Sequence, residues 1–147
     1  MKKIGLMFLV IGTVVTQSFA AEPMIPLAKY VSQDNHEAGY VLDRCAALFL
    51  QFSGRARNLP QSEALNSLSE KYFALGLMSY MGLADPGTTM EIAAKEYLVS
   101  LERIAKNYGA ALDDNYMKEG HRVNGNELIE DDTAVCGEVL SRLSSKN

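Results

Sequence analysis

The sequence predicts an all-α protein, an up-and-down bundle of four helices with one disulfide that links the first and last helices. Apolar residues recur at helical spacing in four segments, which short polar or glycine-containing stretches separate. After residue 20 no segment shows the alternating, β-branched pattern of a strand. Cys45 and Cys136 lie on the apolar stripes of the first and last segments, so we expect them to form a disulfide.

The chain begins with residues 1–20, a segment typical of a cleaved signal peptide. Two lysines precede an apolar run, and small residues precede the expected cleavage site after Ala20. Residue 21 is alanine, whereas bacterial lipid attachment needs a cysteine there. We therefore expect a periplasmic or secreted protein that is not a lipoprotein, with residues 21–147 forming a single helical domain.

Residues 21–33 contain two prolines and are expected to form an extended lead-in to a helical core of residues 34–144. Asp34 and Glu37 have the spacing of a capping box, which places the first helix at about residues 35–57. Its apolar stripe recurs at steps of four and three residues and consists of Val41, Cys45, Leu48, Phe52 and Ala56.

The second helix is expected over residues 62–84, between residues 58–60 and the turn at residues 85–87. From Tyr72 onward it is apolar on nearly every face, which is typical of the most buried helix of a bundle. It also carries a second apolar stripe, which consists of Phe73, Leu77, Met81 and Ala84. This stripe either completes the core or lines a surface for a partner or an apolar ligand.

The third helix is expected over about residues 89–118, after a capping box formed by Thr88 and Glu91. Gly109 either lies within this helix or ends it, which would create a fifth helix. The last helix is expected over residues 127–144. Its first turns hold acidic residues, which the helix dipole favours there: Glu127, Glu130, Asp131 and Asp132.

The sequence lacks the residue patterns that carry the common catalytic and metal chemistries. His36 and His121 are not at metal-ligand spacing, and the cysteines are not in a C-x-x-C motif. No nucleophile elbow or phosphate-binding loop is present. Several carboxylates, Asp43, Glu70, Glu96 and Glu102, are expected on helix surfaces. We therefore expect no enzymatic activity, no cofactor and no metal site.

The charge of the chain is acidic, with a formal net charge of −4. Arg55 and Arg57 are the only close pair of cations after residue 20, and there is no basic patch. An acidic surface is unfavourable for binding a nucleic-acid backbone or an anionic membrane. We expect no nucleic-acid partner and no stable membrane insertion once the signal segment is removed.

The run Tyr40-Val41-Leu42-Asp43-Arg44-Cys45-Ala46-Ala47-Leu48-Phe49 resembles a helix of small secreted bacterial proteins of unknown function, in which Arg-Cys-Ala precedes an apolar turn. The resemblance covers about ten residues and implies a helical protein with a disulfide; no activity comes with it. In outline the chain is also similar to small helical periplasmic acid-stress chaperones that hold one disulfide. This second likeness concerns the fold alone.

These features predict a non-enzymatic helical protein of the periplasm or cell exterior that acts through a protein partner. An inhibitor, an immunity-type protein, an accessory subunit and a chaperone-like protein all fit this description. The alternative is a carrier that holds an apolar small molecule or lipid between the bundle helices. An enzyme that uses dispersed carboxylates is a third, weaker hypothesis.

Overall fold

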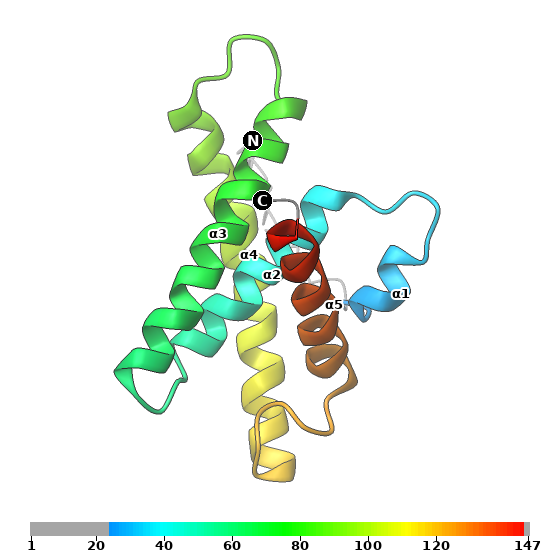
Figure 1. Ribbon diagram of the computed structural model, residues 1–147, viewed down its shortest axis with the longest axis vertical. Helices are drawn as coiled ribbons and strands as arrows, with labels where there is room; N and C mark the ends of the chain where they lie inside the picture. Colours follow the sequence, from blue (N-terminus) through cyan, green and yellow to red (C-terminus); the bar gives the residue numbers. More distant parts are fainter. Residues whose placement is uncertain (1–23, 146–147) are drawn as a thin grey trace, which may run out of the picture.

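The computed structural model describes residues 24–145, and in this part of the chain every regular element is a helix (Figure 1). The expected signal segment, residues 1–20, lies outside the described residues. The helices are α1 (Leu27–Val31), α2 (Ala38–Ser53), α3 (Leu59–Leu83), α4 (Met90–Glu119) and α5 (Glu127–Ser144). The predicted all-α bundle is confirmed. Within the described range no helix has the length and apolar character needed to cross a membrane.

The centre of the bundle is α2. The six consecutive residues Arg44, Cys45, Ala46, Ala47, Leu48 and Phe49 are all buried. Helices α3, α4 and α5 all pack against α2, which explains why even successive faces of this helix are covered. The prediction that the second long helix is the most buried one is therefore wrong: in α3 only Ser69, Tyr72 and Gly76 are buried.

Small residues allow α2 and α3 to pack closely as antiparallel neighbours. At one end the Ser53 and Ser62 hydroxyls each donate a hydrogen bond to the other residue's backbone carbonyl, both at 3.0 Å. Further along, the Ser69 hydroxyl donates to the Ala46 carbonyl at 2.8 Å. Apart from the buried Tyr72, the larger apolar residues of α3 stay partly or fully exposed.

Helix α4 passes through Gly109 without a break. A Cβ atom at this glycine would lie 3.0 Å from the side-chain oxygen of Gln51. Gly109 therefore serves the close approach of α2 and α4, and it is not a cap. The helix ends at Gly120, whose φ of 76° is in the left-handed region that favours glycine. The fifth helix of the fold is accordingly α1, at the other end of the chain.

The expectation of an extended lead-in over residues 21–33 is wrong for Leu27–Val31, which form the short helix α1. Two carboxylates of α5 hold this helix in place. The backbone nitrogens of Leu27 and Ala28 donate to the side chains of Asp132 and Asp131, each at 2.7 Å. These carboxylates satisfy the free N–H groups with which any helix begins. Asp131 and Asp132 thus serve α1 in addition to lying near the start of their own helix.

Several predicted helix boundaries also differ from the structure, and α4 is capped by Thr89 and not by the expected Thr88. The Asp34 capping box does not form, since α2 begins only at Ala38 and its N-cap residue makes no side-chain cap. The segment expected to end the first helix instead begins α3. The Asn58 side chain accepts a hydrogen bond from the Gln61 nitrogen at 2.9 Å, and proline occupies the first turn, where its missing N–H costs nothing.

The ends of α3 and α4 that are joined by residues 84–89 rise together beyond the rest of the bundle (Figure 1). Helix α2 reaches only partway along α3, and its Gly39 lies against Ser79. Among residues 24–145, no third helix covers the α3–α4 hairpin beyond this point (Figure 1). The far end of α4 and the α4–α5 loop lie at the opposite end of the molecule.

Candidate functional site

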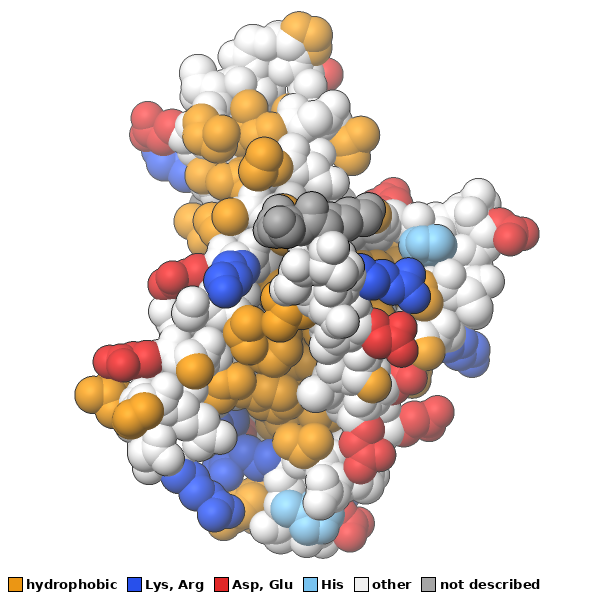
Figure 2. Space-filling view, viewed as in Figure 1, with side chains coloured by type: hydrophobic (Ala, Val, Ile, Leu, Met, Phe, Trp, Pro, Cys, Tyr) orange, Lys and Arg blue, Asp and Glu red, His pale blue; other side chains and the backbone are white. Residues whose placement is uncertain are grey.

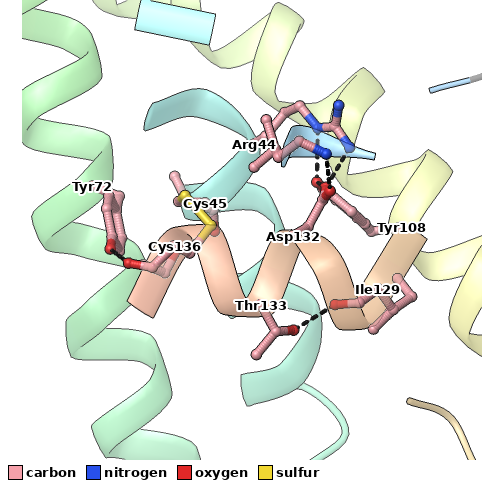
Figure 3. Close-up of a disulfide and its surroundings, with 11 residues drawn as sticks. Arg44, Cys45, Tyr72, Tyr108, Ile129, Asp132, Thr133 and Cys136 are labelled. Carbon is pink, nitrogen blue, oxygen red and sulfur yellow. Dashed lines mark hydrogen bonds and ion pairs between the residues drawn. A yellow bond between two sulfur atoms is a disulfide. The ribbon is translucent and has the colours of Figure 1, made fainter. Parts of the chain in front are cut away.

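A buried polar network lies at the centre of the bundle, beside the disulfide (Figure 3). The Arg44 guanidinium pairs with the Asp132 carboxylate, and both side chains are completely buried. Arg44 Nε also donates to the Tyr108 hydroxyl at 2.9 Å, and its Nη1 donates to the Ile25 carbonyl at 2.6 Å. The Tyr108 hydroxyl in turn donates to Asp132. The network therefore joins α2, α4, α5 and the start of the described chain.

Burial is what makes this network sensitive to change. Burial alone raises the pKa of Asp132, and the donors Tyr108, Arg44 and Leu27 oppose that rise. Burial alone would lower the pKa of Arg44, but the Tyr108 and Asp132 partners outweigh it and the pKa is raised. A buried charge of this kind is tolerated only while its partners remain. The network is enclosed by protein, which suits a role in stability.

Cys45 and Cys136 form the expected disulfide, with their Cα atoms 5.5 Å apart. Both cysteines are fully buried. The Tyr72 hydroxyl donates to the Cys136 carbonyl, so α3 also contacts the bridge (Figure 3). The bond links α2 to α5 in the core, and a disulfide of this kind is typical of proteins in an oxidising compartment.

A second polar contact, between Asp43 and Tyr97, lies where α2, α3 and α4 meet. The Tyr97 hydroxyl donates to Asp43 Oδ1 at 2.5 Å. Only a glycine fits beside it, because a Cβ atom at Gly76 would lie 2.8 Å from the Asp43 oxygen. Burial raises the pKa of Asp43, and the Tyr97 hydrogen bond partly offsets this. Asp43 is thus not the simple surface carboxylate that the sequence predicts.

The second apolar stripe of α3 is half-buried along its whole length: Phe73, Leu77, Met81 and Ala84 are all intermediate in exposure. The Phe73 ring lies 5.2 Å from the Tyr97 ring of α4. One end of the stripe therefore packs on the core, as the first of the two sequence alternatives requires. The other end belongs to the projecting hairpin, where the second alternative stays open.

Large apolar side chains are exposed on the projecting hairpin and on the turns of α3 and α4 next to it, and we call this set the hairpin face. It consists of Met78, Leu83, Met90, Ile92, Leu98 and Val99. The exposed fractions reach 69% for Met78, 84% for Leu83 and 71% for Val99. Figure 2 shows hydrophobic side chains gathered over the upper part of the molecule, where α3 and α4 rise together. Such concentrations on a soluble protein commonly mark interaction sites.

An open cleft of about 500 Å³ lies at the other end of the bundle, between the end of α2, the start of α3 and the α4–α5 loop. We call it the arginine cleft. It is lined by Phe52, Arg55, Ala56, Arg57, Gln61, Leu65, Arg122 and Val123. Figure 2 shows Lys and Arg side chains at the lower end of the molecule, next to a hollow with a hydrophobic floor. The cleft combines apolar walls with cationic groups.

The guanidiniums of the cleft differ in how far they are neutralised. Arg55 is bound to Asp113 through Nε at 3.1 Å and Nη2 at 2.8 Å, and this holds the pKa of Asp113 below its usual value. Arg122 stacks on the Tyr116 ring at 4.4 Å from the ring centroid. Its Nε lies 3.9 Å from Asp113 and has no hydrogen-bond partner among the described residues. Arg57 forms no ion pair within residues 24–145.

The two histidines lie apart, one before α2 and one after α4, and both are exposed. His36 Nδ1 lies 3.0 Å from the Gln33 carbonyl, and the His121 carbonyl accepts from the Asn115 amide at 2.9 Å. Among residues 24–145 no group of three His, Cys, Asp or Glu side chains is placed to hold a metal ion.

Sequence reasoning did not identify the buried Arg44–Tyr108–Asp132 network or the contribution of Arg122 to the cleft. A signal for the first was present, because Arg44 directly precedes Cys45 on a stripe whose other members are apolar. An arginine in that position needs a buried partner. No local pattern announces that Arg122 joins the cleft. We compared the chain with protein-family models, with curated proteins and with solved structures, and none of them matches it.

Proposed function

We propose that this protein is a non-enzymatic interaction protein of the periplasm or cell exterior, and that its partner is a protein bound by the hairpin face. The carrying observation is the exposure of large apolar side chains on and next to the hairpin, where α3 and α4 project beyond the rest of the bundle (Figure 1). Keeping such side chains in water forgoes about 1.5–3 kcal/mol for each one that a partner would bury fully. A partner would recover part of this free energy.

The composition of the hairpin face favours a protein partner with an apolar surface. Met78 and Met90 carry flexible, polarizable side chains that adapt to the shape of a partner. Two polar contacts lie on the same hairpin: Lys95 pairs with Glu91 at 3.2 Å, and the Tyr80 hydroxyl donates to Glu96 at 2.7 Å. Protein–protein interfaces commonly combine apolar side chains with polar groups of this kind.

Two features support a location outside the cytoplasm. The disulfide is typical of oxidising compartments. Residues 1–20 have the layout of a signal peptide, and we propose that they are removed after Ala20. N-terminal sequencing of protein taken from the periplasm or the medium tests this, because Ala21 should be the first residue. Cytosolic protein that retains Met1 would contradict it.

The hairpin face is tested by comparing two methionines that lie on different parts of the surface. Met78 belongs to the face and is 69% exposed, whereas Met117 lies near the other end of α4 and is 81% exposed. Met78→Asp should abolish capture of a stoichiometric partner from extracts of the producing cells and their surroundings. Met117→Asp should leave the capture unchanged. Since both side chains are exposed, both variants should keep the melting temperature of the parent within a few degrees.

The proposal fails if no protein is captured in stoichiometric amount, or if Met78→Asp captures it as well as Met117→Asp does. Light scattering of the purified protein separates a further outcome. A dimer that Met78→Asp dissociates would mean that the face binds a second copy of the chain, and the proposal of a different partner would then be wrong.

A carrier of a small molecule is the second candidate function, because the arginine cleft is an open cavity with both apolar and cationic lining. Its volume of about 500 Å³ is in the range of pockets that hold small organic ligands.

A further inference from the structure

We propose that the arginine cleft binds an amphipathic organic anion, a molecule with a hydrocarbon body and a single carboxylate head. The site lies at the opposite end of α4 from the hairpin face, so it is independent of the proposed protein partner. The proposal rests on the second candidate function, that of a small-molecule carrier, and adds a charge to the ligand. The sequence alone predicts only an apolar ligand.

The head of the ligand is assigned from the charges of the cleft. Three guanidiniums line it, those of Arg55, Arg57 and Arg122, and among the described residues Asp113 is the one carboxylate that pairs with any of them. Asp113 bonds Arg55 in a two-pronged contact and forms only a long ion pair with Arg122, at 3.9 Å. Among residues 24–145, Arg57 therefore has no carboxylate partner and Arg122 is only partly neutralised, in a chain whose net charge is negative. Guanidinium groups of this kind favour a carboxylate, which they bind through two parallel hydrogen bonds.

The start of α3 adds to the same field. Gln61 lines the cleft and lies in the first turn of α3, whose N-terminus carries the positive end of the helix dipole. Its backbone nitrogen is already bound to Asn58, so the contribution is electrostatic and not a direct contact. The helix supports the assignment of an anion, while the guanidiniums determine where the anion sits.

The body of the ligand is assigned from the walls. Phe52, Leu65 and Val123 line the cleft and are only partly buried, although they pack against the hydrophobic core. An inorganic anion would leave these apolar walls in water, whereas a hydrocarbon chain would cover them at about 25 cal/mol per Å² of apolar surface. The cleft thus fits a molecule that carries both parts.

Arg55 has a different role from its two neighbours. Its guanidinium bonds Asp113 and the side chain of Gln51, and it approaches the Gly109 carbonyl at 3.4 Å. These contacts fix it between α2 and α4, so it forms a rigid cationic wall. Arg57 is exposed and the Arg122 side chain is 41% exposed, so these two groups would turn toward the ligand.

The test uses decanoate as the probe and isothermal titration calorimetry of the purified, oxidised protein. Methyl decanoate has the same chain without the charge, and acetate has the charge without the chain. We expect both to bind at least about tenfold more weakly than decanoate, since each lacks one set of contacts. Equal binding of the ester would overturn the assigned head. Equal binding of acetate would overturn the assigned body.

Charge-matched variants locate the site. Arg57→Gln and Arg122→Gln should each weaken decanoate binding by about tenfold. Arg142→Gln removes the same charge from an exposed position on α5 and should leave binding unchanged. In methyl-labelled NMR spectra, decanoate should shift the signals of Leu65 and Val123. Absence of decanoate binding, or binding that all three variants share, would overturn the proposal.

The hairpin variant separates this proposal from the proposed protein partner. Met78→Asp should bind decanoate as the parent does. Failure of decanoate to bind would leave the evidence for the hairpin face intact, and failure of partner capture would leave the cleft intact.

Discussion

The Asp132 carboxylate accepts a hydrogen bond from the backbone nitrogen of Leu27 at 2.7 Å, across 105 residues of chain. The same side chain pairs with Arg44 and accepts from Tyr108. One residue of α5 therefore holds the first helix of the described chain and neutralises the charge buried in the core. Removing Asp132 would therefore disrupt both the start of α1 and the pairing of Arg44.

Asp132→Ala should lower the free energy of unfolding by about 3–5 kcal/mol, because Arg44 would remain buried without its carboxylate. Urea denaturation measures the change. The neighbouring Asp131→Ala serves as the control, since it loses only the bond from Ala28 and should cost about 1 kcal/mol. Equal losses in the two variants would contradict the importance of the buried pair. Replacing Arg44 and Asp132 together by leucine should recover much of the loss.

Replacing Cys45 and Cys136 together by serine should lower the free energy of unfolding by about 4–5 kcal/mol in the chain-entropy model. The far-UV circular dichroism spectrum should remain strongly helical at low temperature, because the apolar stripes specify the helices independently of the bond. Urea denaturation and circular dichroism report the two quantities. A spectrum without helical signal would show that the helices depend on the bridge.

Gly76→Ala should destabilise the protein by about 1–3 kcal/mol, because the new methyl group would displace the Tyr97 hydroxyl and its bond to Asp43. Thermal melts of this variant are best compared with those of Gly82→Ala. Gly82 is a helical glycine of α3 with no neighbour within 4 Å of an added Cβ, so its replacement should stabilise by up to about 1 kcal/mol. If both variants melted alike, the close approach at Gly76 would be ruled out.

Tyr97→Phe should raise the pKa of Asp43 further, because the hydroxyl that lowers it would be gone while the burial that raises it remains. Carbon-13 NMR of the carboxyl signals follows this titration. Asp113 is an internal reference: its pKa is lowered by Arg55, which the variant leaves in place. An unchanged or lower Asp43 pKa would contradict the role assigned to Tyr97.

The contributions of Asp43 and Asp113 to the free energy of unfolding depend on pH in opposite directions. The folded pKa of Asp43 lies above its unfolded value, so its contribution is present in full below the unfolded pKa and is lost as the pH rises through the folded pKa. The folded pKa of Asp113 lies below its unfolded value, so its contribution is present above the unfolded pKa and is lost as the pH falls.

The fold class and the disulfide could be predicted because both follow from periodicity. Apolar residues at helical spacing define the long helices, and they place Cys45 and Cys136 on faces that must meet in a bundle. The helix α1 could not be predicted in this way. It is a single short turn whose stability comes from Asp131 and Asp132, at the far end of the chain.

The degree of burial of α3 was mispredicted for a related reason. Apolar composition identifies residues that gain from burial, but the close approach of α2 is decided by small residues such as Ser69 and Gly76. The arginine cleft depends on the same kind of information. Arg55 and Arg57 are visible as neighbours in the sequence, whereas Arg122 joins them only because the α4–α5 loop folds back toward the start of α3.

The bond between Cys45 and Cys136 also determines how the chain carries a mechanical load. When the two ends of the described chain are pulled apart, the tension runs along the backbone to Cys45, crosses the sulfur bridge and continues from Cys136. The stretch of chain between the two cysteines, which are 91 residues apart in sequence, bears no tension. Pulling would therefore peel away α1, the first turns of α2 and the last turns of α5. Helices α3 and α4, with the hairpin face and the arginine cleft, would keep their shape under the load.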